Sequence, residues 1–507
     1  MALELELKLC GSPAALRSLL KGPLLPTIAL GPLRRQNLLS TYYDSPALEL
    51  TRAGGALRLR KHGRRWLQTL KLRGSGGAGL SAREEIELPA PAAALDLVAL
   101  QAALATSSSL VLPALVQPLF TTRFARTTLE VRLPGGGRAE LAFDIGTIDA
   151  GEQSEALSEI EIELLEGAPF EVFALGRQLL AETELRVGNR SKAERGFALL
   201  APLPAAAQYA SAVELDGADA AQLGAARLLG EALGQLEGNE AGLMQGGDPE
   251  FIHQARVAMR RLRALLRLFA PLLADGTLDS LKAELRTVAQ GLGRCRDLDV
   301  LCAETLPRLQ AGLVAESAPT LLPLIEAALA ARVEARSAAR SELQKRAYTD
   351  LKLGLGELIA RLADRSQWPS ETTSLAEFAS ARLQRASRRL QGARDVREAV
   401  PAEAAVERVA ATHALRIEVK KLRYACEALG PIFPGRRTRR YQRRLQRLQS
   451  LLGSFNDAAT AQGMAAELLP CSAATASVQG YAAARMLELM EQLPAELGRF
   501  DRSRIFW

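Results

Sequence analysis

The stretch Leu3-Glu4-Leu5-Glu6-Leu7-Lys8-Leu9 decides the architecture of the first part of the chain, because leucine alternates with a charged residue at every step. A period of two places the charged side chains on one face of a β-strand and the leucines on the other. The same alternation returns at residues 57–60, 83–88 and 159–164. Glycine-rich turn signals, such as residues 74–77, separate the runs. The sequence therefore predicts a sheet of charged strands over residues 1–200.

Ordered charges on so many strands favour a closed barrel over an open sheet. A single charged strand face is usually a solvated surface, and an open sheet would gain little from several of them. A barrel with a polar interior and an apolar exterior covered by helices would use every charged set. Such an interior would hold carboxylates near one side and cations near the other. Helical patterns occur at residues 12–21, 91–105 and 170–185.

Carboxylates and cations inside one barrel suggest a metal-dependent site for a polyanion. Mg²⁺ and Mn²⁺ prefer oxygen ligands, and Mg²⁺ is commonly held by one or two carboxylates together with substrate phosphates. Two opposite unit charges in contact contribute about 4 kcal/mol at an effective dielectric of 20, so a triphosphate needs several cations and metal to leave water. Residues 1–200 contain no P-loop, no histidine cluster and no Ser-His-Asp arrangement.

A Pro- and Ala-rich segment separates the charged strands from a second part with a helical period. We expect a first domain over residues 1–200, a linker over 201–214 and an all-α domain over 215–500. The fold class is therefore α+β multidomain.

The helical part contains an internal repeat. The segment that begins His253-Gln254-Ala255-Arg256 recurs from His413, an offset of 413 − 253 = 160, and residues 293–297 recur at 453–457 with the same offset. Two landmarks at one offset indicate duplicated sub-bundles, at about 215–370 and 371–500.

Composition narrows the class of protein. The chain has 507 residues, 48% of them apolar and 24% charged, which is typical of a globular protein able to bury its own core. The net charge of +7 suggests an anionic partner. Five cysteines without paired spacing argue against a disulfide scaffold and a zinc site. With no membrane-length apolar run and no signal pattern, we expect no membrane partner and a cytoplasmic protein.

The charged strands resemble the CYTH superfamily, the triphosphate tunnel metalloenzymes. Six landmarks occur in order over about 195 residues, and Ser45 stands where the family has threonine. The resemblance implies an eight-stranded antiparallel tunnel, with flanking helices, that binds triphosphate compounds with Mg²⁺ or Mn²⁺. The landmarks are Glu4-x-Glu6-x-Lys8, Tyr42-Tyr43-Asp44-Ser45-Pro46, Leu57-Arg58-Leu59-Arg60 with Thr69-Leu70-Lys71, Arg83-x-Glu85-x-Glu87, Glu159-x-Glu161-x-Glu163 and Ser191-Lys192-Ala193-Glu194-Arg195-Gly196.

The resemblance also implies roles for individual residues. A water oriented by the metal would attack the terminal phosphorus, helped by Lys8, Glu161 and Glu163 as catalytic residues; which carboxylate orients the water stays open. The expected metal ligands are Glu4, Glu6, Asp144, Glu159, Glu161 and Glu163. The expected substrate-binding residues are Lys8, Arg58, Arg60, Lys71, Arg83, Arg123 and Lys192.

The helical part resembles the CHAD domain, which is associated with inorganic polyphosphate, and the resemblance implies an association with polyphosphate granules. The match rests on His253-x-x-Arg256 with its following arginines and on the second copy at His413, and it covers roughly residues 215–500. The repeated basic stripes predict a groove for a phosphate polymer, with binding that weakens steeply with salt. Nucleic acid is a weaker candidate, because aromatic residues make up 5% and none interleave with the stripes. The expected polyphosphate-binding residues are His253, Arg256, Arg260, Arg263, His413, Arg416, Lys420 and Arg423.

These features together predict a hydrolase, an inorganic triphosphatase that cleaves tripolyphosphate to pyrophosphate and phosphate and whose helical domain binds polyphosphate. One alternative keeps the tunnel but changes the substrate: a thiamine or nucleoside triphosphatase, or a class IV adenylate cyclase. Another is a non-catalytic polyphosphate-binding protein. The products formed from tripolyphosphate, ATP and thiamine triphosphate distinguish the three.

Overall fold

A computed structural model describes residues 2–63, 65–72, 74–106, 108–200, 206–246, 248–273, 276–314, 317–369, 371–401 and 404–507. The chain forms two compact units. The first comprises Met1–Ala206 with Gln344–Asp364, and the second comprises Ala207–Leu343 with Arg365–Trp507.

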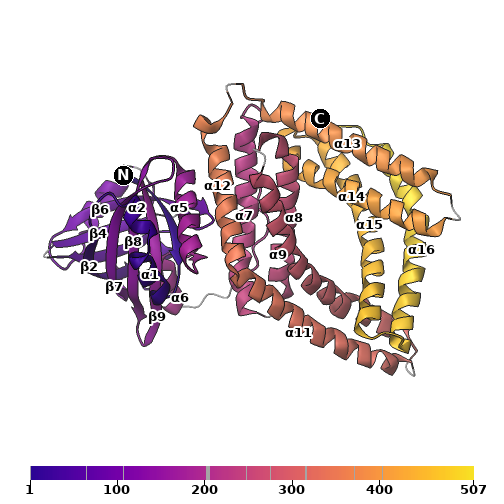
Figure 1. The fold of residues 1–507 in the computed structure, drawn as a ribbon, viewed down its shortest axis with the longest axis horizontal. Helices are drawn as coiled ribbons and strands as arrows, with labels where there is room; N and C mark the ends of the chain where they lie inside the picture. The colour runs from indigo at the N-terminus through magenta and orange to yellow at the C-terminus, as the bar shows by residue number, and fades with distance from the viewer. Residues whose placement is uncertain are drawn as a thin grey trace. The chain divides into compact units, whose positions relative to one another are not determined.

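The first unit is built on a closed antiparallel barrel, which confirms the predicted tunnel. Its strands pair in the order β1-β9-β8-β7-β2-β3-β4-β6, and pairing of β1 with β6 closes the ring. Figure 1 shows the strands curving around a common interior. Two short strands extend the sheet: β5 (Ser75–Gly77) pairs with β6, and β10 (Arg186–Val187) pairs with β1. The barrel strands are β1 (Ala2–Cys10), β2 (Arg34–Asp44), β3 (Ala56–His62), β4 (Arg65–Lys71), β6 (Leu80–Ala90), β7 (Gln117–Arg132), β8 (Arg138–Ala150) and β9 (Gln153–Glu166).

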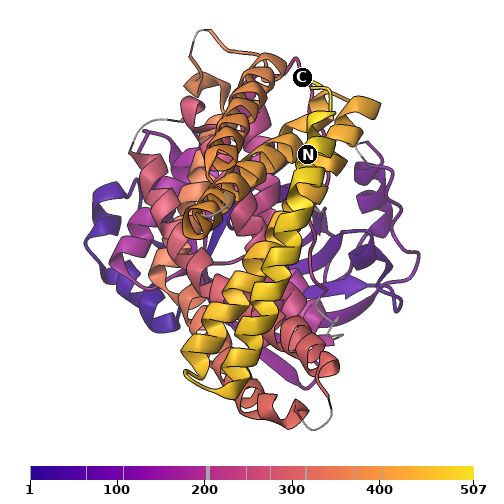
Figure 2. The same cartoon turned by 90° about the vertical axis from the view of Figure 1, so that its right-hand side faces the viewer.

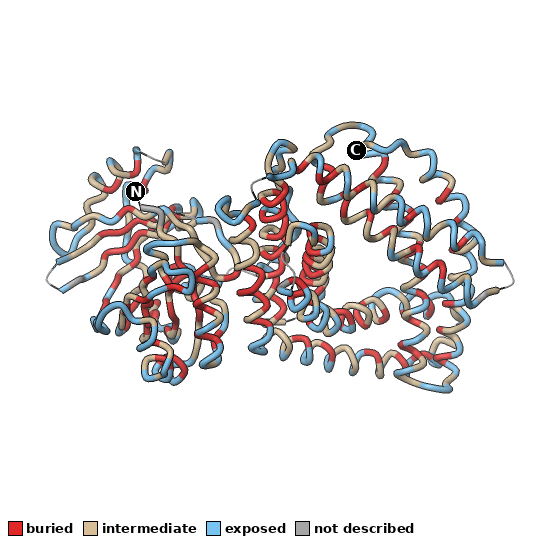
Figure 3. The backbone as a smooth tube through the Cα atoms, turned by 45° about the horizontal axis from the view of Figure 1, so that its top comes forward, coloured by how far each residue is buried: buried red, intermediate tan, exposed pale blue. Residues whose placement is uncertain are grey.

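Alternation along the strands sends apolar residues outward, under helices, and charged residues inward. Leu7 and Leu9 on β1 are fully buried and lie against α5 (Pro169–Glu182). Leu57 on β3 belongs to a core covered by α4 (Leu97–Leu104). The inward residues Glu6 and Lys8 are also buried, so both faces of β1 contain buried positions. Figure 3 shows buried and exposed positions along the barrel strands. Other helices of this unit are α1 (Pro13–Lys21), α2 (Leu24–Ile28), α3 (Glu49–Arg52) and α6 (Lys192–Leu200).

The first unit also contains α12 (Arg346–Ala363), a helix that lies between the two halves of the helical part in sequence. Arg177 on α5 pairs with Asp350, with Nε and Oδ1 2.8 Å apart. At Gly356 a Cβ would stand 2.4 Å from the Phe173 ring, so the helices approach too closely for any larger residue. The expected sub-bundle over 215–370 assigns this segment to the helical domain, whereas it packs with the barrel because its apolar face lies on α5.

The second unit is helical, as predicted. Long helices joined by short turns pack as antiparallel pairs, α7 with α8, α13 with α14, and α15 with α16. Figure 1 and Figure 2 show α15 and α16 side by side along most of their length. The repeat places α8 and α9 in the positions that α14 and α15 hold in the second copy. The helices are α7 (Ala221–Gln245), α8 (Pro249–Leu268), α9 (Thr277–Val300), α10 (Leu306–Gly312), α11 (Leu322–Gln344), α13 (Leu375–Ala399), α14 (Ala405–Leu429), α15 (Arg436–Leu468) and α16 (Ala473–Asp501).

No helix formed by the described residues combines the length and the apolar composition that crossing a membrane requires.

Candidate functional site

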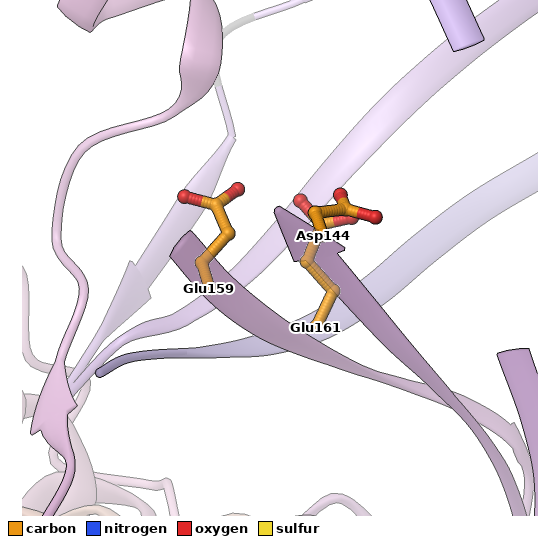
Figure 4. A group of neighbouring side chains, drawn as sticks. All are labelled: Asp144, Glu159 and Glu161. Carbon is orange, nitrogen blue, oxygen red and sulfur yellow. The ribbon is translucent and has the colours of Figure 1, made fainter. Parts of the chain in front are cut away.

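The barrel interior holds three carboxylates from two neighbouring strands. Pairing of β8 with β9 sets Asp144 opposite Glu159, and Glu161 follows two residues later on the same face of β9. Oxygen atoms of the three groups lie within 4.8 Å of one another, an arrangement able to hold a metal ion. Figure 4 shows the three carboxylates on the same side of these strands.

Lys192, the first residue of α6, lies in the middle of this carboxylate cluster. Its Nζ is 2.5 Å from Glu159 Oε1, 2.7 Å from Glu161 Oε1 and 2.8 Å from Asp144 Oδ2. Burial opposes the charge of Lys192, but the three carboxylates outweigh burial and raise its pKa. Its ammonium group is therefore held charged inside the barrel.

Three further cations surround the same cluster. Lys8 Nζ lies 3.3 Å from Glu161 Oε1 and 3.6 Å from Glu159 Oε1. Arg126 donates to both oxygens of Asp144, at 2.7 and 2.6 Å, and to Glu161 at 2.5 Å. Arg195 Nη1 lies 3.0 Å from Glu159 Oε2. Four cations thus face three carboxylates, so this cluster is already neutralised by the chain itself.

A second acidic group lies farther along the same faces and has fewer cations. Strand pairing sets Glu163 opposite Glu6 on one side and opposite Glu140 on the other. Burial, followed by the neighbouring carboxylates of Glu4, Glu140 and Glu6, outweighs the opposing effect of Lys71 and raises the pKa of Glu163 to about 7. We call Glu4, Glu6, Glu140 and Glu163 the acidic row. Its excess negative charge and oxygen-only donors suit a divalent cation.

Lys71 and Arg58 approach the acidic row from the facing strands. Lys71 Nζ lies 2.5 Å from Glu4 Oε2 and 3.0 Å from Glu85 Oε2, and Arg58 Nη2 lies 3.4 Å from Glu85 Oε1. Burial acts to lower the pKa of Arg58, but Tyr42, Glu85 and Glu87 outweigh burial, so the pKa is raised overall. Lys71 therefore joins Glu4 of the acidic row to Glu85, which Arg58 of β3 also contacts.

Arg58 and Arg60 are two crowded arginines of β3, and Arg58 keeps a donor without a partner among the described residues. Within the described residues, the buried Nε of Arg58 has no hydrogen-bond partner. Arg60 Nε donates to Ser40 Oγ at 3.2 Å, and burial, Arg58 and Arg126 lower its pKa to about 10. Two crowded arginines, one of them with a buried donor that lacks a partner, are suited to bind an anion such as a phosphate.

Arg83 and Arg123 differ from the other predicted substrate residues. Arg83 sits opposite Glu4 across the β1–β6 pair and is loosely held, its Nη2 3.8 Å from Glu194. Arg123 is exposed, whereas its neighbours Thr122 and Phe124 are buried. Because residues alternate, Arg126 is the arginine of β7 that points inward, and the structure does not bring Arg123 to the site.

Sequence reasoning missed Arg126, Arg195 and Glu140. Knowledge of the strand register would have identified two of them, since Arg126 is opposite Asp144 and Glu140 is opposite Glu163. However, no sequence signal shows which strands are neighbours, so these pairs could not be found before the fold was known. Asp44 of the second landmark has a structural role, accepting hydrogen bonds from the backbone N–H groups of Ser45, Leu50 and Thr51.

The helical unit contains a basic cavity of about 550 Å³ between α8, α13, α14 and the segment 211–213. The lining includes three of the predicted residues, Arg260, Arg263 and Lys420. Burial, followed by nearby arginines, lowers the pKa of Lys420 to about 8. Sequence reasoning missed the whole contribution of α13. The cations that line the cavity are Arg260, Arg261, Arg263, Arg267, Arg382, Arg385, Arg389, Lys420 and Lys421.

The remaining predicted residues of this unit lie outside the cavity lining. Arg256 pairs with Asp297 at 3.4 Å. In the second copy, burial lowers the pKa of Arg416 despite its neighbour Asp457. His253 is half-buried, and His413 is exposed. Arg423 pairs with Glu427 and lies over the Tyr424 ring, 4.8 Å from its centroid.

The fold and the site define a class: a closed tunnel barrel with opposed carboxylates and cations, joined to a helical domain with a basic cavity. Comparison with known proteins agrees, since the CYTH domain profile matches residues 2–197 and the CHAD domain profile matches residues 227–466. The chain belongs to the proteins that join a CYTH domain to a CHAD domain.

Several known proteins are similar to parts of this chain. The chain is 35% identical over 201 residues to an inorganic triphosphatase of Haemophilus influenzae, which covers 39% of this chain and 55% of that protein. The chain thus spans about half the length of this curated relative. It is similar to the crystal structure of the CHAD domain from the plant Ricinus communis, with 30% identity, a TM-score of 0.51 and coverage of 59% of this chain and 98% of that one. It is also similar to PptA from Streptomyces chartreusis, at 20% identity and a TM-score of 0.41, over 56% of this chain and 99% of that one.

Proposed function

We propose that the barrel is an inorganic triphosphatase that hydrolyses tripolyphosphate to pyrophosphate and phosphate with Mg²⁺ or Mn²⁺. One observation carries the proposal: two crowded arginines, with the buried Nε of Arg58 unpartnered among the described residues, and an acidic row with too few cations occur inside one barrel. The Haemophilus influenzae relative named as an inorganic triphosphatase supports the same activity. Lys8, Lys71, Lys192 and Arg83 would complete the contacts to the three phosphates.

The acidic row is the better place for the metal. Asp144, Glu159 and Glu161 have suitable geometry, but Lys192 and three other cations already neutralise them. Glu163 has carboxylates on both neighbouring strands. Glu4, Glu6 and Glu163 would therefore hold the ion, with Glu140 close by. When bound, the ion would neutralise phosphate charge and acidify the attacking water.

The chain's own groups would act by position and charge, as phosphoryl transfer requires. Arg58, whose buried Nε has no partner among the described residues, and its neighbour Arg60 would bind the phosphates. Glu161 is occupied by Lys192 and Arg126, so the proton of the attacking water would pass to a carboxylate of the acidic row. The bond from the terminal phosphorus to the bridging oxygen breaks, and pyrophosphate leaves.

Phosphate release from tripolyphosphate, with ATP and thiamine triphosphate in parallel, tests the proposal. We expect Glu163→Gln and Glu6→Gln each to lose about 100-fold in metal-dependent rate. Glu166→Gln, at the exposed end of the same strand β9, is the matched control and should keep the wild-type rate. Full turnover in Glu163→Gln would refute the site. Formation of cyclic AMP from ATP would indicate a cyclase. No product from any of the three substrates would indicate a binding protein.

We further propose that the helical unit binds inorganic polyphosphate. Nine cations line its cavity, against the carboxylates of Glu418 and Glu427. The logarithm of the binding constant should fall linearly with the logarithm of salt concentration. Arg385→Glu with Arg389→Glu should weaken binding at least tenfold, whereas Arg388→Glu, an exposed residue of the same helix outside the lining, should change it little. Equal loss in both variants would contradict the assignment.

A cytoplasmic location belongs to the same proposal. Its support is chemical: the described residues include five cysteines, all of them free thiols, which fits a reducing compartment.

A further inference from the structure

The basic cavity of the helical unit is lined by two unlike kinds of side chain. Arginines and lysines come from α8, α13 and α14. Apolar residues, among them Val213, Leu268, Ala428 and Pro431, come from α8, from α14 and from segments beside the helices, and we call this apolar part of the lining the apolar wall. Each of these four is half-buried or exposed, so it presents surface to the cavity instead of belonging wholly to the core. A ligand that fills this space meets both the cations and the apolar wall.

Buried polar atoms of both kinds lack partners around the cavity. Among the described residues, Arg260 Nε and Arg382 Nε are buried donors without an acceptor. Glu418 Oε2 is a buried acceptor without a hydrogen-bond donor, although Glu418 Oε1 accepts from Lys421 Nζ at 2.5 Å. Unsatisfied buried groups are costly and rare in native proteins. The donors need an anion, and the carboxylate oxygen needs an N–H or O–H group.

Inorganic polyphosphate satisfies only part of this site. It supplies negative charge for the arginines, but it has no apolar surface for the wall around Leu268. At neutral pH its internal phosphates carry no proton to donate to Glu418. A second carboxylate, Glu427, also lines the cavity and would repel a purely anionic ligand.

We propose that this cavity binds a nucleoside polyphosphate. The phosphates lie on the arginines of α8 and α13, the flat base packs on the apolar wall, and an amino group of the base donates to Glu418 Oε2. The volume of about 550 Å³ falls within the range of about 300–1,000 Å³ that small-molecule sites occupy. This goes beyond the polyphosphate binding proposed above and does not depend on the tunnel reaction.

The segment before α7 gives the site a local reporter. Ser211, Ala212 and Val213 line the cavity. The backbone N–H of Ser211 donates to Glu231 Oε1 at 2.5 Å, and Glu231 Oε2 pairs with Arg261, another lining residue, at 2.5 Å. A ligand in the cavity should therefore slow hydrogen exchange of residues 211–213 together with α13 and α14.

The test is calorimetric titration of the full chain, in EDTA, with ATP, GTP and tripolyphosphate, followed by hydrogen exchange to locate the binding. We expect at least one nucleotide to bind about tenfold more tightly than tripolyphosphate and to protect residues 211–213. Glu418→Gln should weaken nucleotide binding about tenfold or more, the usual effect of losing a hydrogen bond to a charged group. The same variant removes a negative charge, so tripolyphosphate binding should be unchanged or tighter.

Arg388→Glu, outside the lining on α13, is the control that should leave both ligands unaffected. Nucleotides that bind no better than tripolyphosphate would overturn the proposal, as would a Glu418→Gln variant that weakens both ligands equally. Either result leaves the polyphosphate and tunnel proposals standing, because the polyphosphate proposal is tested by substituting Arg385 and Arg389 and the tunnel proposal by substituting Glu163 and Glu6.

Discussion

Replacing Lys192 by methionine should destabilise the barrel strongly, and the structure gives the size of the effect. Its Nζ contacts three carboxylates at 2.5, 2.7 and 2.8 Å, and the side chain is 6% exposed. By Coulomb's law each contact contributes roughly 6 kcal/mol at an effective dielectric of 20, before desolvation and repulsion from Lys8 and Arg126 are subtracted. Breaking a buried ion pair in this way typically costs about 3–5 kcal/mol.

Hydrogen exchange of the β8 and β9 amides in EDTA measures this loss, because it reports the free energy of opening of those strands. Lys61→Met, on an exposed position of β3, is the matched control and should lose less than about 0.5 kcal/mol. Mn²⁺ should restore protection to Lys192→Met, since the three carboxylates within 4.8 Å would then have lost the one cation that contacts all three. A loss below about 1 kcal/mol in EDTA would refute the view that Lys192 neutralises the cluster.

Three other predictions follow from single residues. The folded-state pKa of Glu163, about 7, lies above its ordinary value of 4.5. Without metal, the free energy of unfolding should therefore fall as the pH rises from 4.5 to 7. Glu163→Gln should abolish that slope in a pH series of thermal unfolding. Lys420, with a pKa of about 8, is charged below pH 8, so polyphosphate binding should weaken as pH rises past 8, and Lys420→Arg should flatten this dependence in titrations. Gly356→Ala should cost about 1–3 kcal/mol in calorimetry, because its Cβ would meet the Phe173 ring, whereas Gly392→Ala, with open space around it, should not destabilise the chain.

The barrel was predictable because its signal is local. Alternation of leucine and charge in β1 and β9 fixes both the strand conformation and the face on which the charges lie. The number of such strands with ordered charges favoured a closed barrel over an open sheet. The inward positions of Lys8, Asp144 and Glu159 agree with that alternation.

The choice between Arg123 and Arg126 shows where local reasoning stopped. Both arginines occur in one strand, three residues apart, so they must face opposite sides of the sheet. The buried neighbours of Arg123 and the pairing of Arg126 with Asp144 decide which one points inward. An apolar pattern interrupted by threonines at positions 121–122 and 127–128 did not reveal that face.

The sequence by itself determined that strands carry their charges on one face and that the helical part is a repeat with basic stripes, because side-chain periodicity depends only on backbone geometry. Only the tertiary structure decided that α12 packs with the barrel, that α13 supplies arginines to the cavity, and that Lys192 lies among three carboxylates. These contacts join residues far apart along the chain. They depend on which surfaces pack together, and no local pattern encodes that choice.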